Sequence, residues 1–113
     1  MSYAFNPTKT ELALLAMIRW RESGGNYGRA PRDPPRQTAS GAYQFIRGTW
    51  KDAMSTTGVG QQYVDAFQAP VLAQDTNALW LLREYGANSP HAWAASGLYP
   101  SDAEVSYVVS AVG

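Results

Sequence analysis

Apolar and polar side chains recur with helical spacing near the start of the chain. Thr8 and Glu11 have the S/T-x-x-E spacing of a capping box, directly ahead of an apolar run. Gly24 follows that run and is typical of a helix end. The pattern therefore predicts a helix over residues 9–23.

The buried face of this predicted helix includes a carboxylate. Leu15, Ile18 and Glu22 fall at positions i, i+3 and i+7, so they share one stripe. Glu22 then lies in the last turn, on or beside the face that packs against the core. A carboxylate in such a place loses part of its hydration, and we expect its pKa to rise.

Helix signals also dominate the rest of the chain. Thr49 and Pro70 suit helix starts, and Ser101 with Glu104 forms a second capping box. We expect helices over residues 50–55, 61–68, 70–85 and 89–95, and a final helix after Ser101. No strand-like alternation of useful length is present. The sequence therefore predicts a mainly α protein, a single domain over residues 1–113 with about five to six helices and at most a short β-hairpin.

Charge is distributed unevenly, although nine basic and nine acidic residues cancel over the whole chain. Seven basic residues lie between Arg19 and Lys51 against two acidic ones, whereas one basic residue faces six acidic ones from Asp52 onward. Several of the arginines fall in a proline-containing loop over residues 26–40, which is long for a plain connector. The loop is either a solvated arginine-rich insertion or a surface for an anionic partner, which could be nucleic acid or a wall polymer with carboxylates.

Other features narrow the class of protein. The absence of cysteine excludes disulfides and thiolate metal sites. The apolar stretches are too short to span a bilayer, and no signal peptide is visible at the N-terminus, so we expect no membrane insertion. The zero net charge and the lack of a binding motif argue against a nucleic-acid partner.

Most of the acidic residues have ordinary explanations, and Glu22 is the exception. Glu11 and Glu104 fit capping boxes, and the remaining carboxylates occupy helix ends, helices or the loop without a special pattern. A desolvated Glu22 would stay partly protonated near neutral pH, as a general acid requires. The structural alternative is an ion pair of Glu22 with Arg19 or Arg21.

Glu22 begins the first of three short sequence segments that follow one another along the chain. Residues 22–27 read E-S-G-G-N-Y, residues 40–45 read S-G-A-Y-Q-F, and Thr49 and Trp50 follow. This order resembles the lytic transglycosylase and resuscitation-promoting-factor group of the lysozyme-like superfamily, over Ile18 to about Trp50. The resemblance implies a small lysozyme-like fold. The chain departs from the group in lacking its A-Y-N motif and in its longer, more basic loop over residues 28–39.

The resemblance also implies roles for individual residues. Glu22 matches the catalytic acid of the group. The residues that match the cleft-lining segment, or that are the nearest substitutes for the missing motif, are the expected substrate-binding set: Ser40, Gly41, Tyr43, Gln44, Phe45, Trp93 and Tyr99. Tyr43 and Phe45 would offer apolar surface to sugar rings, and Gln44 would offer amide hydrogen bonds. The alternative for Phe45 and Trp50 is a place in the core, which we favour for Trp50.

The implied reaction is cleavage of the β-1,4 bond between N-acetylmuramic acid and N-acetylglucosamine in peptidoglycan strands. Most glycosidases need a second carboxylate, and the sequence offers no convincing one; Asp33 and Asp52 are the candidates to test. A single glutamate instead suits a lytic transglycosylase, which closes a 1,6-anhydro ring. We expect no metal ion and no cofactor.

Alternative functions follow from the same residues. A hydrolytic lysozyme would use water in place of the muramyl C6 hydroxyl, and a non-catalytic module would bind the wall or build a virion. A serine hydrolase using His91 is disfavoured because no G-x-S-x-G elbow is present. We expect the protein to act in the bacterial cell wall, as a monomer or as part of a larger assembly, in the manner of a phage-encoded lysin or virion-associated enzyme.

Overall fold

The computed structural model describes residues 3–85 and 102–112 of the chain. These ranges are mainly helical, which confirms the predicted class. The elements are four α-helices and one short 3-10 helix: Lys9–Ser23 (α1), Arg47–Thr57 (α2), Ala66–Gln68 (η1), Val71–Tyr85 (α3) and Asp102–Val112 (α4). Between them only isolated β-bridges occur in the described ranges, joining Asp33 to Gln37 and Ser40 to Phe45.

Helix α1 begins and ends where local signals predict. The Thr8 side chain accepts from the Glu11 N–H at 3.1 Å, and the Glu11 carboxylate accepts from the Thr8 N–H at 2.9 Å. At the other end Gly24 adopts the left-handed conformation, with φ 66°, and its N–H donates to Trp20 O at 3.0 Å. The predicted capping box and the predicted boundaries of this helix are therefore both confirmed.

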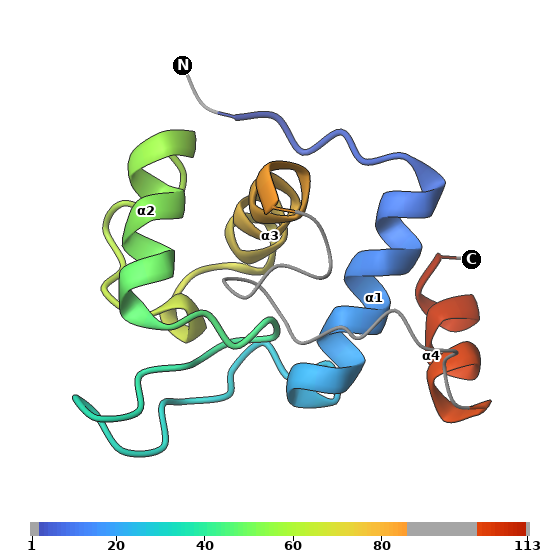
Figure 1. Ribbon diagram of the computed structural model, residues 1–113, viewed down its shortest axis with the longest axis horizontal. Helices are drawn as coiled ribbons and strands as arrows, with labels where there is room; N and C mark the ends of the chain where they lie inside the picture. The colour runs from blue at the N-terminus through green and yellow to red at the C-terminus, as the bar shows by residue number, and fades with distance from the viewer. Residues whose placement is uncertain (1–2, 86–101, 113) are drawn as a thin grey trace.

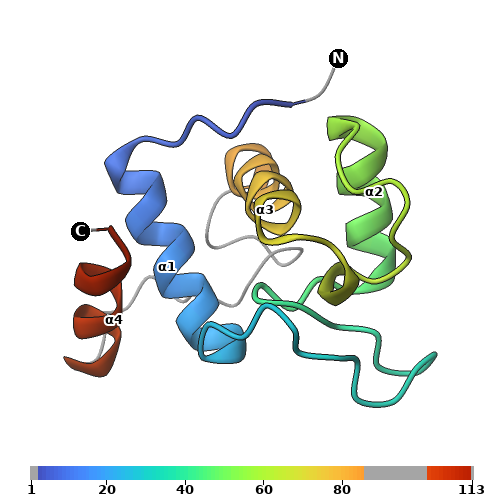
Figure 2. The ribbon, with the colours of Figure 1, turned by 180° about the vertical axis from the view of Figure 1, so that it is seen from behind.

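Helix α3 lies between α1 and α2, and α4 packs against α1 on its far side (Figures 1 and 2). Leu15 and Ile18 of α1 are fully buried in the core, together with Leu79 of α3. Trp50 of α2 is also fully buried, as we expected, and its ring meets Phe45 at a centroid distance of 5.3 Å. No helix in residues 3–85 or 102–112 combines the length and the apolarity needed to cross a membrane.

Helix α2 is longer than predicted, and its start lies elsewhere. The predicted cap, Thr49, is inside the first turn, and the N-cap position is Ile46, whose side chain makes no capping hydrogen bond. A distant residue serves instead: the Thr38 hydroxyl accepts from the Arg47 N–H at 3.0 Å. The prediction of a helix over residues 50–55 was too short because this cap comes from the long loop.

The helix predicted over residues 61–68 was wrong. Only Ala66–Gln68 is helical, as the 3-10 helix η1. Trp50 holds the segment ahead of it, because its ring N–H donates to Tyr63 O at 2.9 Å. Asp65 then pairs with Arg47 through bonds of 2.7 and 3.0 Å. These contacts to α2 fix residues 61–65 in an irregular path.

The last two predicted helices are found with small differences. Helix α3 begins at Val71, one residue after the predicted Pro70, and runs through Tyr85. Helix α4 starts at Asp102, as the second capping signal indicates, although Ser101 lies outside the described residues. The helix predicted over residues 89–95 also lies outside them.

Candidate active site

Glu22 lies in the last turn of α1 and its side chain is half-buried. Burial raises the pKa of Glu22 above its usual value, and the nearby Arg29 guanidinium partly offsets the rise. Within residues 3–85 and 102–112, no hydrogen bond or ion pair holds its carboxylate. Arg19, which we considered as an ion-pair partner of Glu22, donates instead to the Tyr43 hydroxyl at 2.7 Å.

Short contacts attach the end of α1 to the turn at residues 41–44. The Ser23 hydroxyl donates to Ala42 O at 2.7 Å and accepts from the Asn26 N–H at 3.0 Å. One guanidinium N–H of Arg29 donates to the backbone oxygen of Glu22 at 2.9 Å. The Gly41 N–H in turn donates to Arg29 O at 2.8 Å. Glu22 therefore has a defined position relative to this turn and to the start of the loop.

Gly41 is required by the geometry of the turn. Its φ is 79°, and a Cβ atom there would lie 2.5 Å from the Gln74 side-chain oxygen. That oxygen accepts from the Ala42 N–H at 3.0 Å, so a buried hydrogen bond joins the turn to Gln74 of α3. Ser40 and Phe45 close the turn by exchanging two backbone hydrogen bonds of 3.0 Å each.

The predicted cleft-lining residues have unequal exposure. Ser40 and Gly41 are buried, and the Ser40 hydroxyl accepts from the Phe67 N–H at 3.1 Å. Tyr43 is fully buried and Phe45 is 2% exposed. The expectation that these two rings offer surface to sugars is therefore corrected: they pack in the core beneath the turn.

Gln44 is the member of the 40–45 segment that is partly exposed. Its backbone has a φ of 53°, and its side-chain amide donates to Gly41 O at 2.9 Å. An amide group carries two N–H bonds, so a second donor remains for a ligand. Trp93 and Tyr99, the other expected substrate-binding residues, lie outside the described residues, as does His91.

A partly buried polar network close to the site was not anticipated from the sequence. The Tyr27 and Tyr43 hydroxyls both donate to one carboxylate oxygen of Asp75, each at 2.6 Å, and Arg19 lies 4.0 Å from that oxygen. Burial, and then the Asp75 carboxylate, raise the pKa of both tyrosines, so both hydroxyls remain donors. Tyr107 of α4 joins the network by accepting from the Arg19 Nε at 3.4 Å.

This network positions the end of α1 relative to α3 and α4. Asp75 gave no sign of the role in the sequence, because its partners come from residues 19, 27 and 43 and meet it only in the folded chain. The one hint was that Tyr27 and Tyr43 each lie within a segment that carries the resemblance.

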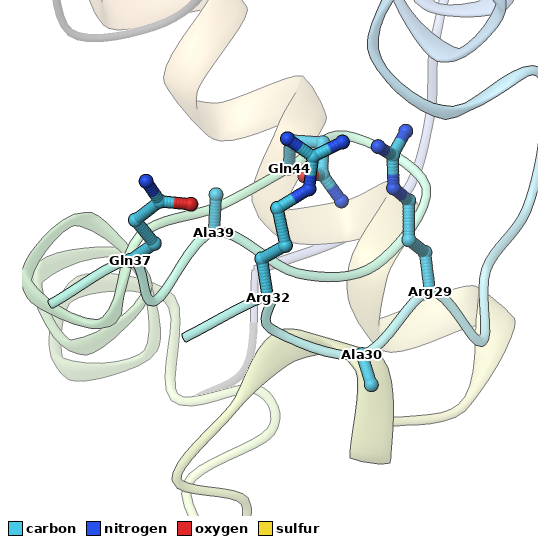
Figure 3. A pocket seen from close by; sticks show the side chains of 6 residues that line it. All are labelled: Arg29, Ala30, Arg32, Gln37, Ala39 and Gln44. Atoms are coloured by element: carbon cyan, nitrogen blue, oxygen red, sulfur yellow. The ribbon is translucent and has the colours of Figure 1, made fainter. Parts of the chain in front are cut away.

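A pocket of about 200 Å³ opens between the loop and the turn (Figure 3). Its lining joins arginine and glutamine side chains to two alanines: Arg29, Ala30, Arg32, Gln37, Ala39 and Gln44. Arg29 is also the residue that bonds to the backbone of Glu22. The pocket therefore lies next to the candidate acid and carries positive charge.

Neither candidate for a second carboxylate is held close to Glu22 by a contact in the described ranges. Asp33 is exposed at the tip of the loop, and Asp52 is exposed on α2. No group of three potential metal ligands among His, Cys, Asp and Glu was found in residues 3–85 and 102–112. A larger pocket of about 420 Å³, near Tyr3 and Tyr63, includes none of the predicted site residues.

Comparisons with known proteins add no relative: no family model matches the chain, and neither a curated protein nor a solved structure matches it.

Proposed function

We propose that the chain is a peptidoglycan-cleaving glycosidase of the lytic transglycosylase type, with Glu22 as its catalytic acid and then base. The observation that carries the proposal is the surroundings of Glu22: a half-buried carboxylate with a raised pKa and no ion pair in the described ranges. A helix-end carboxylate that is merely structural is normally paired or exposed, and a general acid needs this raised pKa. The lysozyme-like fold is part of the same proposal.

The reaction needs one carboxyl group in two protonation states. Protonated Glu22 donates its proton to the glycosidic oxygen, and the bond from that oxygen to the muramyl C1 breaks. The neighbouring N-acetyl group stabilises the positive charge at C1. The Glu22 carboxylate then removes the proton of the muramyl C6 hydroxyl, and the C6 oxygen bonds to C1 to form the 1,6-anhydro ring. Glu22 ends protonated, so the cycle is balanced without water.

The surroundings of the other carboxylates support a single-glutamate mechanism. Asp75 already accepts two tyrosine hydroxyls, so its oxygen is occupied by the network. Asp33 and Asp52 are both exposed, so their surroundings do not resemble the half-buried surroundings of Glu22. In this proposal the substrate lies along the end of α1 and the turn at residues 41–44, with Gln44 as a hydrogen-bonding group, and the protein acts on the bacterial cell wall.

Mass spectrometry of the soluble products from purified peptidoglycan tests the proposal. Muropeptides that lack a reducing end and are lighter by one water molecule than hydrolysed ones are expected from the parent protein. Glu22→Gln should remain folded and release none. Reducing-end products would instead indicate a hydrolytic lysozyme, and the search for a second carboxylate would begin with Asp33 and Asp52.

A third outcome separates the enzyme from a binding or virion module. A well-folded parent protein that binds the wall without releasing products would overturn the glycosidase. Wall binding is measured by co-sedimentation with insoluble peptidoglycan, and Glu22→Gln serves as the matched variant because it changes charge with little change in shape.

A further inference from the structure

The pocket beside Glu22 has the chemistry of an anion subsite. Two of its lining side chains are arginines, and no acidic residue lines it. Figure 3 shows the side chains of Arg29 and Arg32 extending in the same direction. A guanidinium offers several N–H donors in a planar fork, which matches the two oxygens of a carboxylate.

The volume of the pocket limits what it can accept. About 200 Å³ is smaller than the cavities that enclose whole ligands. It accommodates one polar group and the few carbon atoms that carry it. The pocket is therefore a subsite for part of a larger ligand that continues over Glu22 and the turn.

Backbone hydrogen bonds hold the loop that carries the walls of the pocket. At the base of the loop, the Gly41 N–H donates to Arg29 O at 2.8 Å. Near its tip, Asp33 and Gln37 exchange backbone hydrogen bonds of 2.7 and 3.4 Å. A preformed site of this kind loses less conformational entropy on binding than a disordered loop would.

The two arginines differ in their existing contacts. Arg29 has one N–H bonded to the backbone of Glu22, which orients its guanidinium. Arg32 is exposed and makes no hydrogen bond or ion pair in residues 3–85 and 102–112. Arg32 is therefore available to a ligand, while Arg29 links the pocket to the acid.

We propose that this arginine pocket binds a carboxylate of the glycan substrate, held by Arg29 and Arg32 next to Glu22; the proposal rests on the function proposed above. The carboxylate belongs either to the peptide stem or, in strands without peptide, to the lactyl group of muramic acid. Binding places the muramyl unit beside the acid. It also neutralises the arginine charge that opposes protonation of Glu22, so an anionic substrate favours the acid form.

The test measures binding separately from cleavage. In a Glu22→Gln background, dissociation constants are determined by NMR titration at low ionic strength for N-acetylmuramyl-L-alanyl-D-glutamic acid and for its diamide. The free acid is expected to bind about tenfold more tightly than the diamide, as for a charged hydrogen-bonded contact. Equal affinities would overturn the proposal.

Arg32→Gln and Arg36→Gln form the matched pair of variants. Both lie in the same loop, both remove one positive charge, and only Arg32 lines the pocket. Arg32→Gln should abolish the preference for the free acid, and Arg36→Gln should retain it. An equal loss in both variants would show general attraction to a basic surface and would overturn the site.

A third probe separates the two sources of the carboxylate. It is the peptide-free disaccharide of N-acetylglucosamine and N-acetylmuramic acid, with its free lactyl carboxylate. Weaker binding of this probe to Arg32→Gln would assign the pocket to the lactyl group, and an unchanged affinity would assign it to the stem. If the free acid is preferred but the parent protein cleaves nothing, the pocket is supported and the glycosidase function is overturned. If the parent protein cleaves peptidoglycan but shows no such preference, the glycosidase function is supported and the pocket is overturned.

Discussion

The two ends of helix α1 carry the same side chain in opposite surroundings. Glu11, in the first turn, accepts from Arg83 at 2.8 and 3.0 Å and from the Thr8 N–H, and these bonds lower its pKa to about 2. Glu22, in the last turn, has no such partner in the described ranges, and burial raises its pKa. One helix thus holds two glutamates whose pKa values are shifted in opposite directions, down for Glu11 and up for Glu22. Partners and burial, rather than residue type, determine the direction in which each pKa moves.

The largest difference between the two glutamates is expected in the effect of their substitution on activity. Glu22→Gln should reduce the rate of wall cleavage by about 10³-fold or more, because it removes the proposed general acid and base. Glu11→Gln, the matched change at the other end of the helix, should leave the rate within about twofold, since exposed ion pairs contribute little. Turbidity loss of purified peptidoglycan measures both. Similar rates for the two variants would contradict the assignment.

A third carboxylate sharpens the comparison, because Asp75 is both partly buried and paired. Asp75→Ala removes the acceptor of the Tyr27 and Tyr43 hydroxyls and the charge nearest Arg19. We expect a loss of about 3 kcal/mol in the free energy of unfolding, measured by urea denaturation. Asp52→Ala, an exposed control on α2, should change it by less than about 0.5 kcal/mol. A loss as small as that of the control would show that the network is not holding the fold.

Glu11 should make a smaller, pH-dependent contribution to stability. Its pKa is lowered from 4.5 to about 2, so the stabilisation is complete above pH 4.5 and is lost as the pH falls toward 2. Solvent screens this pair, so Glu11→Gln should cost only about 1 kcal/mol at neutral pH. Thermal unfolding of the parent and the variant at pH 6 and at pH 2 tests this. A difference in Tm that persists at pH 2 would contradict the assigned cause.

For Glu22 the dependence of folding stability on pH has the opposite sign. A raised pKa in the folded state means that the folded chain retains a proton that the unfolded chain releases, so stability declines as the pH rises from the usual value of 4.5 through the raised one. Glu22→Gln should therefore match or exceed the parent in stability at pH 7, by less than about 1 kcal/mol after allowing for its exposure. Below pH 4 the two should coincide. A variant that is clearly less stable at pH 7 would indicate a structural role.

The parts of the fold that could be predicted depend on local signals. Thr8, Glu11 and Gly24 lie within or beside α1, and they determine its ends without help from other elements. The start of α2 could not be predicted, because its cap comes from Thr38 in the loop. The segment over residues 61–65 departs from a helix because Trp50 and Arg47 bind it, and neither contact is visible in its own sequence.

The features of the candidate site that could be predicted are likewise those that depend on local sequence. The place of Glu22 in the last turn and the direction of its pKa follow from spacing along one helix. The burial of Tyr43 and Phe45 does not, because an aromatic side chain in a short turn faces either the core or solvent with no periodicity to decide. Asp75 could not be found because three residues from separate segments converge on it.

The cap that Thr38 provides to α2 means that any opening of the loop would also uncover the first amide of that helix. The Arg47 amide hydrogen is protected only while the Thr38 hydroxyl remains in place, so it exchanges with deuterium whenever the loop opens. The exchange rate of this single amide therefore reports the opening of the arginine pocket. An anion that occupies the pocket should slow the exchange, even though Arg47 does not line the pocket.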